Sequence, residues 1–340
     1  MRFLKTLRVP LTLMLVSFSV YTANAQGVPL DPIKIRVVPE TPEPHSPVLI
    51  ELQDVTATLR DASITWILDG KVTLSGIAKR SFSFRTGGVG SITRVEVQIE
   101  MGSGALITRE FSFRPGSVSL SFEADTYVPP FYKGKAVLSP GASVRVFAFT
   151  DVRDASGNRV SESNLVYEWE RNGTKFADRS GLGLSSFSFQ GNQLSAGEDV
   201  AVTILTRDGT RVARASLFIP SNDPLVRIYE RNPLRGILYE NSLNEVAFLD
   251  QELILVAEPY FFSIPTRKSG GVTFTWNLDG EAVSSENPSA FLSLRNERRE
   301  DGEALVSVSV QNTVRSRLLQ AAEASFPLFF GRTPTNSSLF

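Results

Sequence analysis

The chain has 340 residues, with 35 Lys and Arg against 36 Asp and Glu, a single His and no Cys. This balance excludes a generally basic nucleic-acid-binding surface, and the lack of Cys excludes disulfides and cysteine-ligated metal sites. Hydrophobic residues make up 42% of the chain and include 23 Phe, so it can bury sizeable cores and is not wholly disordered.

Residues 1–25 are predicted to be a removable signal peptide. Three basic residues precede an apolar stretch at 11–20, and Ala23-Asn24-Ala25 fits the small-x-small rule for cleavage. The apolar stretch is shorter than the roughly 20 residues of a membrane span, although an uncleaved anchor is the alternative. We therefore expect an exported protein, extracellular, at the cell surface or periplasmic. Its mature chain would begin at Gln26, carry a net charge of −4 and contain no transmembrane helix.

All three Trp residues lie in one local pattern, W-x-x-[DN]-G. They are Trp66, Trp169 and Trp276, and their spacings are 103 and 107 residues. Asp-Gly and Asn-Gly favour tight hairpin turns because both residues tolerate positive φ. The pattern predicts three repeated units of similar length, with each Trp in the structural core of its unit.

Alternating apolar segments surround each Trp in the same order. Before it, two strands are predicted in each unit: 33–38 and 48–53, 118–124 and 144–149, 225–229 and 253–258. After it come an F-x-F segment, degraded in the third unit, then a V-x-V segment and a closing strand. Period-two alternation indicates strands with one buried face. We predict about seven strands per unit; only 314–324, rich in helix formers, is ambiguous.

The 315 residues after the leader divide into three units of about 105, the usual size of an immunoglobulin-like sandwich. The predicted fold is all-β, with three tandem immunoglobulin-like antiparallel β-sandwiches after the signal peptide. Their predicted bounds are 26–115, 116–222 and 223–330, followed by a polar tail at 331–340.

The Trp hairpin with its F-x-F and V-x-V strands resembles the bacterial Ig-like and PKD-like repeats of exported surface proteins. The segments 127–135 and 257–262 are similar to segments of uncharacterised exported proteins of candidate-phylum bacteria. This resemblance covers most of 33–330 and implies the fold. It implies little about function, because that fold hosts adhesins, spacers, glycan binders and assembly subunits.

The second and third units each carry an extra segment of 18 residues between their first two strands, at 126–143 and 233–250. An ungapped alignment pairs Phe131 with Leu238 and Tyr132 with Tyr239. One interpretation is a partner-binding surface, since aromatic residues dominate interface energetics and lysines favour an acidic partner. The alternative is that these rings pack on their own sandwich or at a joint between units. The candidate partner-binding residues are Tyr127, Phe131, Tyr132, Lys133, Lys135 and Tyr239.

The sequence contains no recognisable catalytic motif. A Ser-His-acid triad would have to use His45, which lies in a Pro-rich crossover and is better explained as a surface residue. The segment Asp151 to Asn158 is the nearest calcium candidate, but it lacks alternating acidic residues and favours an ordinary polar loop. We therefore predict no catalytic residues, no metal site and no cofactor.

The predicted function is a non-enzymatic envelope or surface protein that binds or spaces other proteins. Two alternatives remain at this stage: an array of glycan-binding modules, and a structural subunit of an extracellular appendage or secretion apparatus.

Overall fold

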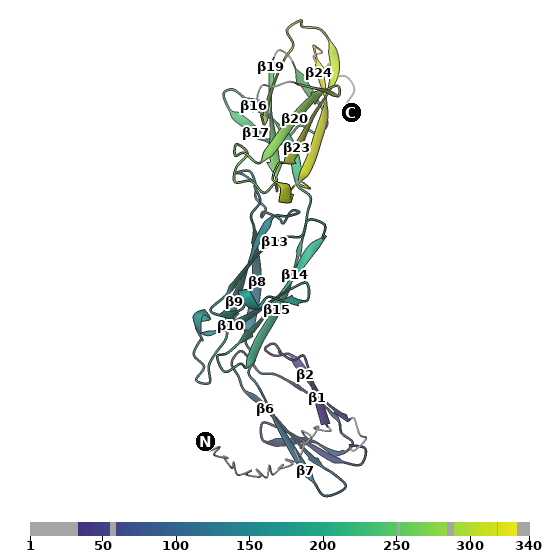
Figure 1. The fold of residues 1–340 in the computed structure, drawn as a ribbon, viewed down its shortest axis with the longest axis vertical. Coiled ribbons are helices and arrows are strands. Elements are labelled where there is room, and N and C mark those ends of the chain that lie inside the picture. Colours follow the sequence, from purple (N-terminus) through teal and green to yellow (C-terminus); the bar gives the residue numbers. More distant parts are fainter. Residues whose placement is uncertain (1–32, 55–58, 250–251, 284–288, 318, 332–340) are drawn as a thin grey trace, which may run out of the picture.

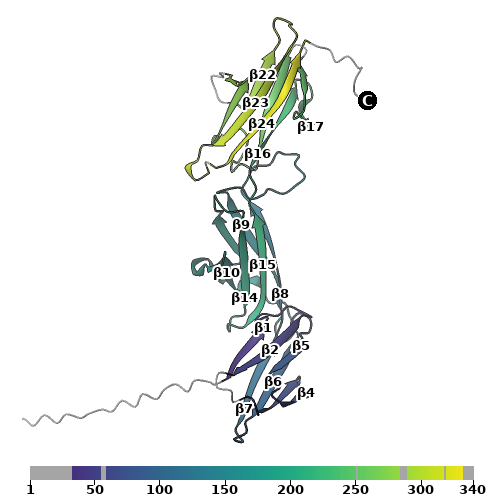
Figure 2. The same ribbon diagram turned by 90° about the vertical axis from the view of Figure 1, so that its right-hand side faces the viewer.

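The structure is a computed structural model that describes residues 33–54, 59–249, 252–283, 289–317 and 319–331. The predicted signal peptide and nearly all of the polar tail lie outside these residues. The described residues form six β-sheets, which follow one another along an elongated molecule (Figures 1 and 2). Three separate hydrophobic cores, each shared by two successive sheets, divide the array into N-terminal, central and C-terminal sandwiches. The all-β fold with tandem antiparallel sandwiches is thus confirmed.

The N-terminal sandwich packs a three-stranded sheet against a four-stranded sheet. The first sheet has the order β1-β2-β5: β1 (Ile33–Val38), β2 (Pro47–Asp54) and β5 (Ser81–Arg85). The second has the order β4-β3-β6-β7: β4 (Lys71–Ile77), β3 (Ser63–Leu68), β6 (Thr93–Glu100) and β7 (Leu106–Phe113). Their alternating inner residues, with Trp66 among them, form one core.

The central sandwich repeats this plan with more short strands. Its three-stranded sheet has the order β13-β9-β8: β13 (Ser186–Gln190), β9 (Ser143–Asp151) and β8 (Ser117–Ala124). The facing sheet has the order β11-β10-β14-β15, with β12 also on β10: β11 (Thr174–Lys175), β10 (Val166–Arg171), β14 (Gly197–Leu205), β15 (Arg211–Pro220) and β12 (Gly181–Leu182). Two 3₁₀ turns, η1 (Glu162–Asn164) and η2 (Ala177–Arg179), flank β10 and β11.

The C-terminal sandwich adds strands to both sheets. One sheet has the order β17-β16-β19-β22: β17 (Gly236–Ser242), β16 (Leu225–Asn232), β19 (Glu252–Tyr260) and β22 (Phe291–Arg295). The other has the order β18-β24-β23-β20-β21: β18 (Ala247–Leu249), β24 (Ala321–Phe330), β23 (Gly302–Asn312), β20 (Val272–Leu278) and β21 (Glu281–Ala282). The ambiguous segment 314–324 contains one 3₁₀ turn, η3 (Arg315–Arg317), and the start of β24.

The three Trp side chains occupy equivalent buried positions. Each indole N–H donates a hydrogen bond to a carbonyl two residues before β5, β13 or β22, with N···O distances of 2.8, 2.9 and 3.0 Å to Lys79, Leu184 and Ser289. In the first two sandwiches the indole also stacks on the first Phe of the F-x-F strand, at 5.3 and 5.6 Å between ring centroids. The buried indole therefore has its only donor satisfied.

The Asp-Gly and Asn-Gly turns adopt the positive φ angles that the sequence predicts, with φ of 47° to 49° at the first residue and 77° to 83° at Gly. The Asp or Asn side chain has a second role. Its Oδ1 accepts a hydrogen bond from a backbone N–H of the neighbouring strand, at 2.8 Å from Asp69 to Arg94, 2.9 Å from Asn172 to Asp199 and 2.8 Å from Asp279 to Leu305. This bond explains why the position holds Asp or Asn.

Candidate functional site

The insertion at 126–143 leaves the central sandwich and packs against the C-terminal one. Tyr127 pairs with the end of β19 through its backbone: its N–H donates to the Phe262 carbonyl, and the Phe261 N–H donates to its carbonyl, both at 2.7 Å. Farther along, the Leu138 carbonyl accepts a hydrogen bond from the Asn222 N–H at 2.8 Å. The insertion is therefore the joint between these two sandwiches.

A buried ionic cluster lies beneath this joint. Glu258 on β19 has no exposed side-chain surface and forms an ion pair with Arg267. The Tyr127 hydroxyl donates to its Oε1 at 2.5 Å, and the Tyr239 hydroxyl donates to its Oε2 at 3.4 Å. Burial, and then the hydrogen bond to Glu258, raise the pKa of Tyr127, so its phenol stays protonated and donates throughout the ordinary pH range.

Aromatic rings gather over this cluster. Tyr132 packs edge-on against Tyr260 and Phe261, with centroids at 5.8 and 5.7 Å. Phe131 packs on Tyr239 at 5.8 Å. The structure thus brings four predicted site residues together: Tyr127, Phe131, Tyr132 and Tyr239. Their exposure differs, because Tyr127 is half-buried whereas Phe131 keeps 76% of its surface in solvent.

The two predicted lysines lie on the solvent side of the insertion. Lys133 and Lys135 are both exposed, and neither forms an ion pair within the part of the chain that the structure describes. Lys135 also lines a cleft of about 890 Å³ beside β8 and β9. The sequence did not single out this cleft, because its floor and its wall come from segments far apart in the chain.

The two insertions of equal length fold differently. Residues 126–142 form no strand, and β9 begins at Ser143, whereas β17 and β18 lie within 233–249. Phe131 and Leu238 are therefore not structural equivalents; Phe131 instead contacts Tyr239 across the joint. The difference follows from composition: Pro129, Pro130 and Pro140 remove backbone donors from the first insertion.

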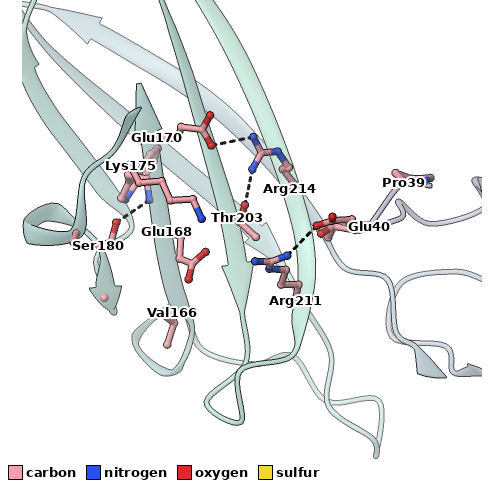
Figure 3. A pocket seen from close by; sticks show the side chains of 14 residues that line it. Pro39, Glu40, Val166, Glu168, Glu170, Lys175, Ser180, Thr203, Arg211 and Arg214 are labelled. Atoms are coloured by element: carbon pink, nitrogen blue, oxygen red, sulfur yellow. Dashed lines mark hydrogen bonds and ion pairs between the residues drawn. The ribbon is translucent and has the colours of Figure 1, made fainter. Parts of the chain in front are cut away.

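A second cleft, of about 600 Å³, lies where the N-terminal sandwich meets the central one (Figure 3). Arg214 bridges Glu170 at 3.3 Å and the Thr203 hydroxyl at 2.9 Å. At its rim, Arg211 of the central sandwich pairs at 3.0 Å with Glu40 of the N-terminal one. Both partners are exposed, so this pair contributes at most about 1 kcal/mol.

Residues considered for catalysis or metal binding do not form a centre. His45 is exposed in the loop after β1, where its backbone bonds Gly87 and Arg85. Asp154 Oδ1 accepts the Ser156 and Asn158 N–H groups, each at 2.9 Å, which makes a closed polar turn. Over the described ranges, no three His, Cys, Asp or Glu side chains gather at a metal-binding distance. No helix in the described part is long and apolar enough to span a membrane.

Comparison with known proteins identifies no family. No family model matches the chain, and no curated protein matches it. The resemblance to bacterial Ig-like and PKD-like repeats is therefore still a prediction, as is the similarity to candidate-phylum proteins.

Solved structures do match over most of the length. The three N-terminal domains of the bacteriophage RB49 Hoc capsid protein are 9% identical, with 87% of this chain and 98% of that chain covered and a TM-score of 0.25. The central fibronectin-III array of RIM-binding protein is 14% identical, with 89% and 98% covered and a TM-score of 0.31. Immunoglobulin domains 1–4 of Sidekick-1 are 11% identical, with 88% and 74% covered and a TM-score of 0.19. Likeness at this level carries no conclusion about ligand or activity.

Proposed function

We propose that this chain is an exported, non-enzymatic protein of the cell surface or envelope, which binds another protein through the joint between its central and C-terminal sandwiches. The observation that carries the proposal is the position of Phe131. Its ring rests on Tyr239 yet stays 76% exposed. A large aromatic ring held in solvent at a fixed place is the kind of side chain that dominates protein interfaces.

The contacts beneath Phe131 support a preorganised surface. The backbone pairing and buried hydroxyl of Tyr127 fix one end of the insertion on the C-terminal sandwich. An isolated β-bridge between Leu138 and Ser221 fixes the other end. A segment already ordered in the free protein loses less conformational entropy on binding, so its contacts contribute more to affinity.

The charge of the insertion favours an acidic partner surface. Lys133 and Lys135 are exposed and unpaired among the described residues, on a chain whose mature net charge is −4. Opposite charges at an interface rim mainly raise the association rate, and salt screens that effect. Binding through this surface is therefore expected to slow as ionic strength rises.

The test uses the full mature chain and a native envelope extract. Wild type is expected to retain a partner protein that Phe131→Ala loses, while both proteins melt at the same temperature. Leu234→Ala, at an exposed apolar residue on the β16–β17 turn of the same sandwich, is the matched control and is expected to retain the partner. Equal retention by wild type and Phe131→Ala would refute the partner surface and leave the spacer interpretation.

A further inference from the structure

The outer face of the β13-β9-β8 sheet carries two phenylalanines that the central core does not use. Phe147 and Phe149 lie two residues apart on β9, so their side chains project from the same face. Ala148, which lies between them, and Val146, which precedes Phe147, are buried in the core. Phe149 is 56% exposed, and Phe147 is partly exposed. The central strand of a solvent-facing sheet thus presents an aromatic stripe.

Serine hydroxyls border this stripe on both sides. Ser119 lies opposite Phe149, while Ser121 and Ser186 lie opposite Phe147 on the two neighbouring strands. In the part of the chain that the structure describes, the hydroxyls of these three serines make no hydrogen bond. The two rings are therefore flanked by three polar groups that can both donate and accept.

Toward the joint, the same face leads into the cleft of about 890 Å³. Its floor is the next row of the sheet, where Arg145 lies between Glu123 and Ser188 and donates to the Ser188 hydroxyl at 3.2 Å. Lys135, Arg179 and Asp125 line the walls, and Arg179 is paired with Asp178. Three cations and two carboxylates line the cleft. Because one of the cations, Arg179, is already paired with Asp178, the cleft has little net attraction for a polyanion.

We propose that this face binds a linear, uncharged polysaccharide, which lies along β9 from Phe149 into the cleft. A sugar ring presents C–H groups on its faces and hydroxyls around its rim. The C–H faces match the exposed rings, and the rim hydroxyls match the bordering serines and the planar Arg145 and Glu123 groups. From Phe149 to Ser143 the track spans about 20 Å at roughly 3.3 Å per residue, long enough for several sugar units.

The serine border argues against a protein as the occupant. Serine is depleted in protein interfaces relative to the rest of the surface. A close-packed apolar partner would also bury the three free hydroxyls without bonds, at a cost of about 1–3 kcal/mol for each unsatisfied group. A polysaccharide supplies a hydroxyl to each of them, so the same contacts become favourable.

The N-terminal sandwich lacks this stripe on its corresponding strand. In the N-terminal sandwich, the residue between Arg36 and Ser81 is Glu51, where the central sandwich has Phe147 between Ser121 and Ser186. The next outward position there is Gln53. The aromatic face therefore distinguishes the central from the N-terminal sandwich, and it shares only Lys135 with the Phe131 surface of the proposed function.

The experiment is affinity electrophoresis of the full mature chain in gels that contain a soluble polysaccharide. Two neutral linear polymers, hydroxyethylcellulose and glucomannan, are the probes, and carboxymethylcellulose provides an anionic form of the cellulose backbone. Wild type is expected to be retarded by at least one neutral polymer and less by the anionic one. Phe149→Ala is expected to weaken that binding about five- to tenfold, because one ring contact is lost.

Two variants make the result specific. Phe218→Ala removes a ring of matched exposure, 55% against 56%, from β15 on the other sheet, and Phe131→Ala removes the ring of the proposed protein surface. Both are expected to bind the polymer within twofold of wild type. The inference is overturned if neither neutral polymer retards wild type, if Phe218→Ala weakens binding as much as Phe149→Ala does, or if the anionic polymer binds more tightly than the neutral ones. A loss of protein capture by Phe131→Ala would leave this result unaffected.

Discussion

Replacing Arg267 by Met tests whether the buried ion pair at the joint stabilises the C-terminal sandwich. Met keeps most of the aliphatic stem and removes the guanidinium. Glu258 has no exposed side-chain surface, and the Arg267 side chain is 13% exposed. The variant therefore leaves a buried carboxylate with only two tyrosine hydroxyls as partners.

The expected cost is at the lower end of the 3–5 kcal/mol typical when one partner of a buried pair is removed. The hydroxyls of Tyr127 and Tyr239 still compensate part of the Glu258 charge, which argues for about 3 kcal/mol. A loss of that size reduces the protection of core amides about a hundredfold. Hydrogen exchange read by mass spectrometry on peptides of β23 would report it, because β23 lies in the core of the same sandwich.

Arg295→Met is the control within the same sandwich. Arg295 pairs with Glu252 at 3.6 Å, and their side chains are 64% and 48% exposed. An exposed pair of this kind contributes about 0–1 kcal/mol, so β23 protection is expected to change less than tenfold. Equal loss of protection in the two variants would refute the argument, since burial of Glu258 would then make no difference.

Four further outcomes follow from the structure. Trp169→Ala is expected to cost about 3–5 kcal/mol through lost burial and a cavity, with faster amide exchange confined to the central sandwich; exchange spread evenly over the chain would contradict separate cores. Burial alone would raise the pKa of Glu198, but hydrogen bonds, first from Arg171, outweigh it and hold that pKa below its usual 4.5. This stabilisation is present above pH 4.5 and is lost as pH falls through the lowered pKa. The free energy of unfolding measured in urea should therefore fall less for Glu198→Gln than for wild type as the pH drops below 4.5. Tyr127→Phe removes one hydrogen bond to a charged group, worth about 1.5–3 kcal/mol, and is expected to separate the calorimetric transitions of the two sandwiches that it joins. N-terminal sequencing of exported material is expected to begin at Gln26, and recovery of Met1 would show an uncleaved anchor.

The strands and turns could be predicted because their signals are local. Alternation along 144–149 and 253–258 marks one buried face, and β9 and β19 contain those segments. The W-x-x-[DN]-G pattern fixes a turn within five residues, and its φ angles match the prediction. None of these inferences needs a contact between distant parts of the chain.

The joint could not be predicted in the same way. The bond from Tyr127 to Glu258 connects residues 131 positions apart, and Arg267 completes the cluster from a loop after β19. In the sequence, Tyr127 belongs to an aromatic run that fits both a presented surface and a packed joint. The structure distinguishes the two residues. The Tyr127 backbone is hydrogen-bonded to Phe261 and Phe262, and Tyr127 is half-buried, whereas Phe131 is exposed.

The aromatic face did leave a signal in the sequence. In the stretch from Val144 to Phe149, apolar residues fill the inward positions, and the outward positions hold Arg145, Phe147 and Phe149. An outward position on a one-sided sheet is normally polar, so two aromatic residues there break the alternation. The equivalent stretch of the N-terminal sandwich has Glu51 and Gln53 outward, and a comparison of the repeats at outward positions would have found the difference.

The two joints differ in the physical basis of their strength. At the first, the ion pair between sandwiches, Arg211 with Glu40, is exposed, so water and salt weaken it. At the second, a buried carboxylate and a buried amide, Gln320 bonded to the Pro140 carbonyl at 2.9 Å, link the sandwiches out of contact with water. Opening the second joint breaks the bonds that Tyr127 and Pro140 make across it, while Glu258 keeps Arg267 and Gln320 keeps Ser263 as partners. Because its cross-joint bonds involve buried groups, the second joint is expected to cost more to open than the exposed ion pair of the first.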